Sequence, residues 1–169
     1  MQTIATPLTS SVERLALLKT AIMWGGATAI IGTAVATLLR LVSPQASAHS
    51  LDQAPVNIAI FVLSALVLAP IIETIIFQSL PIEMLRKLRA PDILIVLECA
   101  VLFGLGHAVY GGTNKGVKTF VDGAIFGSLY LRTRTHSLSA SYWSVAVAHF
   151  TNNLLVLSVG AILVATGLL

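Results

Sequence analysis

The chain has few charged residues. Only 10% of its 169 residues are Asp, Glu, Lys or Arg, whereas a soluble domain typically has about 25%. Together with 56% hydrophobic residues and a mean hydropathy of +0.91, this deficit excludes an ordinary soluble domain and indicates a membrane protein. The net charge is +3, but the basic residues occur in short groups between apolar runs. This distribution is typical of loops that flank membrane helices, and it argues against nucleic acid as a partner.

Cysteine is also scarce. The one cysteine, Cys99, lies inside an apolar run, so an intramolecular disulfide and a cysteine zinc site are both excluded. We predict that Cys99 is a small buried hydrophobic side chain. The apolar runs lack the alternation of polar and apolar residues that outer-membrane strands have, so β-structure is not expected.

Long apolar runs are what the chain has in quantity. Five are present, at residues 20–42, 56–80, 93–110, 120–131 and 142–169. About 20 apolar residues are needed to cross the hydrocarbon core. The first, second and fifth runs are long enough, the third is borderline, and the fourth either extends back through Gly116 or spans only in part. We predict an all-α, polytopic membrane helix bundle of about five transmembrane helices with a buried polar site.

The five runs form one predicted membrane domain over residues 1–169, with an N-terminal helix and loop at 1–55 and a core at 56–169. Ala46-Ser47-Ala48 has the pattern of a signal-peptide cleavage site, but the preceding apolar run is longer than a signal peptide needs, which favours a retained helix. With a cytoplasmic N-terminus and five crossings, seven basic residues lie on the inner face: Arg14, Lys19, Arg86, Lys87, Arg89, Arg132 and Arg134. Arg40, Lys115 and Lys118 lie on the outer face, in agreement with the positive-inside rule.

Several polar residues interrupt the apolar runs, where they are costly and usually functional. They are Glu73, Gln78, Glu98, His107, Asp122, His149, Asn152 and Asn153. Glu73 lies 13 residues before Arg86, and His149 lies 15 after Arg134. At about 1.5 Å per helical residue, these two residues and His107 fall at a similar depth of roughly 20–25 Å from the inner basic groups. Glu98 falls on another face of its helix than His107, so Glu98 and Asp122 are predicted to be structural.

Three short motifs occur in order on these segments: 73-ETIIFQ-78, 103-FGLGH-107 and 149-HFTNN-153. A glycine-rich stretch, 123-GAIFGSLYLRTRT-135, separates the second from the third. Together they resemble the CPBP intramembrane proteases, which include type II CAAX prenyl endopeptidases and Abi-type bacteriocin-processing and self-immunity proteins. The pattern of that family is Glu-Glu-x-x-x-Arg, then Phe-x-x-x-His, then His-x-x-x-Asn or Asp. The resemblance covers about residues 67–155 and makes 56–169 a CPBP-like catalytic core.

The resemblance implies a catalytic site made of Glu73, His107, His149 and Asn153. Two positions depart from the family pattern. Thr74 stands where the second glutamate is usual, and Gln78 stands where the arginine is usual. The implied activity is hydrolysis of a peptide bond in a peptide or membrane-protein substrate within the lipid bilayer.

In this interpretation Glu73 and His107 activate water, and His149 with Asn153 stabilises the oxyanion of the tetrahedral intermediate. A metal alternative stays open, because Glu73, His107 and His149 are also a plausible ligand set for Zn²⁺ with one position left for water. The chain lacks the His-Glu-x-x-His motif of zinc proteases, and the metal-free mechanism is favoured.

Two non-enzymatic hypotheses remain. Thr74 and Gln78 leave room for a catalytically silent immunity or scaffold protein of the same fold. The intramembrane carboxylates and histidines also permit a proton or ion relay, which would depend on Glu98 and Asp122 as well. The expected location is the membrane itself, and the short chain favours the cytoplasmic membrane of a prokaryote.

Overall fold

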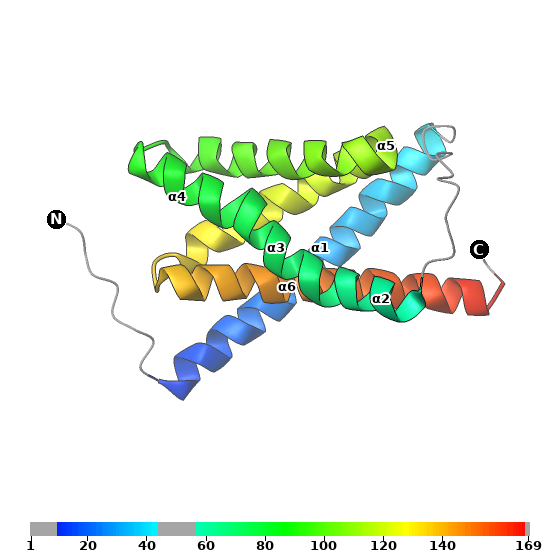
Figure 1. The fold of residues 1–169 in the computed structure, drawn as a ribbon, viewed down its shortest axis with the longest axis horizontal. Helices are drawn as coiled ribbons and strands as arrows, with labels where there is room; N and C mark the ends of the chain where they lie inside the picture. The colour runs from blue at the N-terminus through cyan, green and yellow to red at the C-terminus, as the bar shows by residue number, and fades with distance from the viewer. Residues whose placement is uncertain (1–9, 44–56, 168–169) are drawn as a thin grey trace.

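The computed structural model describes residues 10–43 and 57–167, and all of the secondary structure in these two ranges is helical (Figure 1). The elements are α1 (Ser11–Val42), α2 (Ile58–Leu63), η2 (Ser64–Leu68), α3 (Ala69–Glu73), η3 (Thr74–Ser79), α4 (Leu80–Lys87), α5 (Asp92–Thr133) and α6 (Leu138–Ala165). The predicted all-α bundle is confirmed. The possible cleavage site at residues 46–48 lies outside the described residues.

Elements α2 to α4 form one continuous apolar helix, Ile58–Lys87, with two π-helical turns in it. The turns η2 and η3 each end two residues before a proline, Pro70 and Pro81. A proline has no N–H to donate, and its ring crowds the carbonyl group one turn earlier. Widening the preceding turn relieves this crowding, and neighbouring helices can then satisfy the carbonyl groups that it frees.

Helix α5 contains a sharp reversal at Gly112, whose φ of 75° and ψ of 176° are not helical. A residue with a side chain rarely adopts this conformation, so glycine is needed here. The two legs, 92–111 and 113–133, therefore run antiparallel without a connecting loop (Figure 1). The described residues contain four helices that are long and apolar enough to cross a membrane. Because Gly112 divides α5 into two legs, this number agrees approximately with the predicted five transmembrane helices. The helix that contains the fourth apolar run does extend back through Gly116.

The two legs of α5 approach each other closely at small residues. A Cβ atom added to Gly123 would lie 2.8 Å from the Cys99 carbonyl oxygen, and one added to Gly104 would lie 3.0 Å from that of Gly116. Glycine at such positions lets membrane helices pack backbone to backbone. Cys99 is fully buried at this contact, as predicted. Glycine at positions 104 and 123 thus allows the two legs of this hairpin to pack closely.

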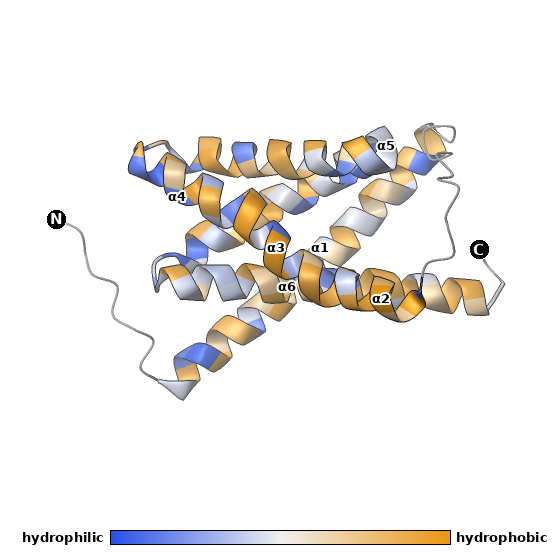
Figure 2. Cartoon of the chain, in the orientation of Figure 1, coloured by the Kyte–Doolittle hydropathy of each residue, from blue (hydrophilic) through white to orange (hydrophobic). Residues whose placement is uncertain are grey.

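Many large apolar side chains are exposed on the bundle, and Figure 2 shows that hydrophobic residues predominate along the long helices. The core is small by comparison and is built around Phe103, Phe126, Tyr130 and Val145. This distribution fits a lipid environment, in which exposed apolar side chains carry no penalty. The chain is an integral membrane protein by length and composition of its helices.

The helix directions place the basic residues at two opposite ends of the bundle. The start of α1, the α4–α5 connection and the α5–α6 connection share one end, while the end of α1 and the Gly112 reversal share the other (Figure 1). At the first end, the Arg134 guanidinium holds the Glu83 carboxylate by two hydrogen bonds of 2.6 and 3.2 Å. The seven basic residues predicted for the inner face therefore lie at the same end.

Candidate active site

Three ionisable side chains from three different passes converge near the middle of the bundle. The Glu73 carboxylate, at the end of α3, lies 3.7 Å from Nε2 of His107 on α5 and 3.6 Å from Nε2 of His149 on α6. The same oxygen, Oε2, makes both approaches. The structure therefore brings together the three residues for which the sequence predicts a common depth.

Both separations exceed the length of a good hydrogen bond, so the carboxylate does not bond directly to either imidazole. Polar groups at such distances are commonly linked through a water molecule. Oε2 of Glu73 and Nδ1 of His149 are both buried without a hydrogen-bond partner among the described residues. Buried polar atoms normally have hydrogen-bond partners, so water or a substrate group is needed to satisfy these two atoms.

The orientation of His107 is set by its own helix. Its Nδ1 lies 2.9 Å from the carbonyl oxygen of Phe103, one turn earlier. A carbonyl group only accepts hydrogen bonds, so Nδ1 must carry the hydrogen and donate it. In the neutral ring, Nε2 then presents a lone pair toward Glu73. The motif Phe-x-x-x-His therefore places a proton acceptor at the site.

His149 is held by aromatic packing rather than by a hydrogen bond. Its ring centroid lies 5.1 Å from that of Phe126 and 5.6 Å from that of Phe103, in a tilted and a T-shaped arrangement. Its side chain is only 5% exposed. Contacts of this kind fix the plane of a ring with little freedom. Nε2 of His149 is thereby held 3.6 Å from Oε2 of Glu73.

Asn153 is anchored to the second helix. Its side-chain Nδ2 donates to the carbonyl oxygen of Ala65 at 2.8 Å, and its Oδ1 accepts from Nδ2 of Asn152 at 3.0 Å. One Nδ2 hydrogen of Asn153 remains for another acceptor. Asn152 also lines the cavity, although the sequence motifs do not predict it as a site residue. Its position three residues after His149, on a neighbouring face of the helix, was the signal that could have found it.

These residues line a cavity of about 280 Å³. All four predicted catalytic residues reach it: Glu73, His107, His149 and Asn153. Lys115, Lys118 and Asp122 line it as well, from the second leg of α5. The sequence placed both lysines on the outer face, and it did not predict that they line the site. They do so because the helix resumes directly after Gly112 and carries them back into the bundle.

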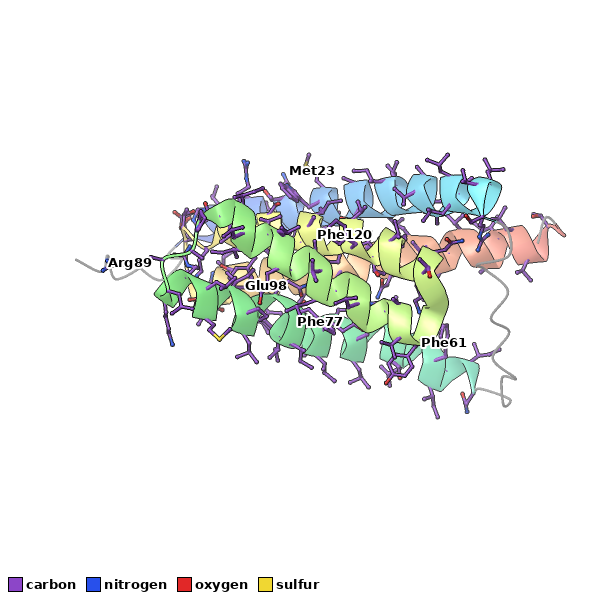
Figure 3. The ribbon with its side chains drawn as sticks, turned by 90° about the horizontal axis from the view of Figure 1, so that it is seen from above. Met23, Phe61, Phe77, Arg89, Glu98 and Phe120 are labelled. Carbon is purple, nitrogen blue, oxygen red and sulfur yellow. The ribbon has the colours of Figure 1, made fainter. Side chains whose placement is uncertain are left out.

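Asp122 has a structural partner, as expected, and the partner is Lys118. Oδ2 of Asp122 lies 2.6 Å from Nζ of Lys118, one helical turn away. Glu98 does not line the cavity. Figure 3 shows Glu98 toward the Arg89 end of the bundle, whereas Phe61, which lines the cavity, lies toward the other end. Glu98 is thus separate from the cluster, as predicted.

Thr74 and Gln78 are completely buried, and their side-chain polar atoms have no hydrogen-bond partner among the described residues. They occupy the two positions where the resembling family has a glutamate and an arginine. A buried charge whose partner is missing is strongly destabilising, by about 3–5 kcal/mol. Because both positions are neutral in this chain, no such charge is left behind. Both charged residues of the family pattern are thus replaced by neutral ones, and Glu73 still lies beside His107 and His149.

The part of the chain that the structure describes contains no group of three or more His, Cys, Asp or Glu side chains placed to hold a metal ion. Glu73, His107 and His149 come nearest to such a set. The predicted zinc set stays a prediction, and a chelator experiment tests it.

Comparison with known proteins adds one finding. Residues 55–155, more than half of the chain, match the family described as type II CAAX prenyl endopeptidase Rce1-like. No curated protein and no solved structure matches the chain. The matched range contains all three motifs and every residue of the Glu73 cluster. The chain therefore belongs to the Rce1-like family of type II CAAX prenyl endopeptidases.

Proposed function

We propose that the protein is an intramembrane endopeptidase that hydrolyses a peptide bond in a peptide or membrane-protein substrate. The observation that carries the proposal is the approach of two imidazole nitrogens to one carboxylate oxygen, at 3.6 and 3.7 Å, inside a cavity of about 280 Å³. Three separate helices supply these groups. Family membership supports a protease of the CAAX type.

The first step requires a nucleophile from water. A water molecule between Glu73 and His107 can donate one hydrogen to the carboxylate and the other to the lone pair on Nε2 of His107. Glu73 then removes a proton as the water oxygen attacks the substrate carbonyl carbon. The side chains of Glu73 and His149 are only 24% and 5% exposed, and charge–charge and charge–dipole interactions are stronger at such buried groups than in bulk water. This arrangement makes Glu73 the general base and His107 the residue that positions the water.

The second requirement is stabilisation of the oxyanion that forms on the substrate. His149 supplies a donor in the tautomer with its hydrogen on Nε2, and Asn153 supplies its remaining Nδ2 hydrogen. Donors held in advance for such an oxyanion commonly contribute about 3–4 kcal/mol each. Collapse of the intermediate breaks the carbon–nitrogen bond, and the proton taken up by Glu73 passes to the leaving amine. The products are a carboxylic acid and an amine, which ionise on release to a carboxylate and an ammonium group, and the enzyme is restored.

A zinc ion held by Glu73, His107 and His149 would supply Lewis-acid chemistry at the same place. The two mechanisms differ in their response to chelators. The test is cleavage of a peptide library, with and without prenyl groups, by purified protein in detergent micelles. Wild type and His149→Ala are compared in parallel, each with and without a chelator. Cleavage by wild type that persists with the chelator supports the metal-free mechanism, and loss that zinc reverses supports the metal set.

A silent immunity or scaffold protein is the alternative that the neutral pair Thr74 and Gln78 supports. It predicts folded wild-type protein that cleaves none of the peptides. A proton or ion relay predicts proton flux in liposomes that depends on Glu98 and Asp122. The proposed setting for all of these is the cytoplasmic membrane of a prokaryote, where peptide maturation and bacteriocin immunity are possible roles.

A further inference from the structure

Helices α1 and α6 cross, and they leave a groove between their N-terminal halves. At the crossing the helices touch through small residues, since a Cβ atom added to Gly25 would meet the carbonyl oxygen of Ala148 and lie 2.7 Å from Cβ of Thr151. From there the two helices diverge toward their N-terminal ends (Figure 1). The space between them is a cavity of about 600 Å³, the α1–α6 groove, which is lined by side chains from residues 14–21 and 137–147.

The α1–α6 groove is separate from the Glu73 cluster. None of the described residues that line it also lines the cavity that contains Glu73. One of its two sides is α1, which precedes the range 55–155 that matches the Rce1-like family. Hydrolysis of a peptide bond at Glu73 therefore assigns no role to this groove.

Polarity changes along the groove. One end has the guanidinium group of Arg14 and the hydroxyl group of Ser139, and it lies at the end of the bundle that carries most of the basic residues. The other end is lined by Ala21 and Val147. Ten residues separate Ser137 from Val147, which is about 15 Å along a helix and half of the roughly 30 Å hydrocarbon core. The groove thus runs from a charged end near the membrane surface through about one leaflet.

The start of α6 supplies backbone donors at the charged end. The first N–H groups of a helix have no acceptor within that helix. Oγ of Ser137 accepts the N–H of Ala140 at 2.9 Å, and the helical ladder begins with the N–H of Ser141. The N–H groups of Leu138 and Ser139 have no acceptor in the part of the chain that the structure describes. Such free N–H groups and the helix dipole stabilise an anion.

Ser144 adds a buried hydroxyl group farther along the groove. Its residue is only 4% exposed, and it lines the groove. Ser141 and Thr151 on the same helix donate to the carbonyl oxygen one turn earlier, at 2.9 and 2.8 Å. The hydroxyl group of Ser144 makes no hydrogen bond within residues 10–43 and 57–167. A buried hydroxyl group normally has a partner, so a ligand with an acceptor below its charged group is expected here.

A phospholipid with a negatively charged headgroup has these groups in this order. Guanidinium groups and helix N-termini both bind phosphate, ester oxygens below the phosphate accept hydrogen bonds, and an acyl chain fits the apolar part. Trp143 lines the groove as well, and tryptophan favours this level of the membrane. The positive-inside rule places this end in the cytoplasm, and the cytoplasmic leaflet carries anionic lipids. Charge therefore favours an anionic lipid over a zwitterionic one.

We propose that the α1–α6 groove binds one anionic phospholipid of the inner leaflet. The phosphate lies between Arg14 and the start of α6, the ester oxygens reach Ser144, and an acyl chain packs between Leu18 and Val147. The bound lipid joins α1 to the part of the chain that matches the family. This inference does not depend on the proposed protease function, because a catalytically silent protein would bind the lipid equally well.

Trp143 reports directly on what occupies the groove. The chain has two tryptophans, so Trp24→Phe leaves Trp143 as the single tryptophan. This protein is placed in phosphatidylcholine nanodiscs that contain increasing fractions of lipid with brominated chains, which quench tryptophan fluorescence on contact. Brominated phosphatidylglycerol is expected to reach half-quenching at an about 5-fold lower mole fraction than brominated phosphatidylcholine. One basic residue near a membrane surface provides a preference of this size.

Two arginine variants in the Trp24→Phe background separate the groove from general attraction. Arg14→Gln is expected to bring the ratio of the two half-quenching fractions close to one. Arg86→Gln makes the same change at an exposed arginine that does not line the groove, at the same end of the bundle, and it should keep the original ratio. Both arginines are exposed, so both variants should fold, and thermal unfolding checks this.

Two results would overturn the lipid site. The first is equal quenching by the two brominated lipids before Arg14 is changed. The second is an equal loss of the ratio in both arginine variants, which would show that anionic lipid is attracted to the basic end as a whole.

A second measurement separates a lipid from a free anion. In detergent micelles, added phosphatidylglycerol should raise the melting temperature of wild type more than that of Arg14→Gln, and inorganic phosphate should raise neither. An equal rise with inorganic phosphate would assign the groove to a free anion and contradict the proposal.

Discussion

Asn153 donates a hydrogen bond to the backbone carbonyl oxygen of Ala65, which the π-helical register of its own helix leaves without a donor. In the π-helical turn η2, the N–H of Ala69 bonds to the carbonyl of Ser64. The next bond in this register would join the carbonyl of Ala65 to residue 70, which is proline and has no N–H. Nδ2 of Asn153 fills the place at 2.8 Å. The asparagine therefore ties α6 to the helix that carries Glu73.

This relationship predicts a partial rescue. Asn153→Ala leaves the half-buried Ala65 carbonyl group without its donor and is expected to reduce the free energy of unfolding by about 1–3 kcal/mol. Adding Pro70→Ala restores a backbone N–H to the same helix, so thermal stability should return toward the wild-type value. Cleavage should not return, because the oxyanion donor is still missing. Recovery of both properties would assign Asn153 a purely structural role.

The buried neutral pair on the second helix predicts coupling between two substitutions. Gln78→Arg alone places an uncompensated charge in the core and should lower stability by about 3–5 kcal/mol. Thr74→Glu together with Gln78→Arg supplies a partner charge and should recover a large part of that loss. Thermal unfolding of the two single variants and the double variant in micelles measures the coupling. Additive losses in the double variant would show that these positions do not interact.

Packing of the α5 hairpin predicts a strong effect at Gly123. A methyl group there would lie 2.7 Å from Cβ of Phe103 and 2.8 Å from the Cys99 carbonyl oxygen, and backbone atoms cannot move aside cheaply. Gly123→Ala is therefore expected to cost about 1–3 kcal/mol of stability. Gly160→Ala is the matched control, because nothing lies within 4 Å of its added Cβ. Equal melting temperatures for the two variants would contradict the close contact between the legs.

The convergence of Glu73, His107 and His149 could be predicted from the sequence because two simple regularities determine it. Apolar runs give the membrane passes, and the basic residues at their ends give the depth of each polar side chain. The family motifs then select Glu73 over Glu98. The separation of Glu98 from the cavity follows from the helical period.

The position of Lys115 and Lys118 at the cavity could not be predicted in the same way. From the sequence, Lys115 and Lys118 follow a glycine pair and are expected in a loop. In the structure, the positive φ at Gly112 lets one helix end and the next begin within a single residue. The π-helical turns are a second example. They arise from hydrogen-bond register around Pro70 and Pro81, and apolar patterning carries no information about register. The bond from Asn153 to Ala65 depends on the register at Pro70.

The central claim is that Glu73 is the general base of an intramembrane protease, and one comparison tests it most directly. The kcat/KM values of wild type, Glu73→Gln and Glu98→Gln are measured on the peptide from the library that wild type cleaves most efficiently. The two variants make the same chemical change, inside the cavity and outside it. We expect Glu73→Gln to lose at least about 100-fold, the contribution of a positioned base, while Glu98→Gln stays within a few-fold of wild type. Retained cleavage in folded Glu73→Gln protein would contradict the account.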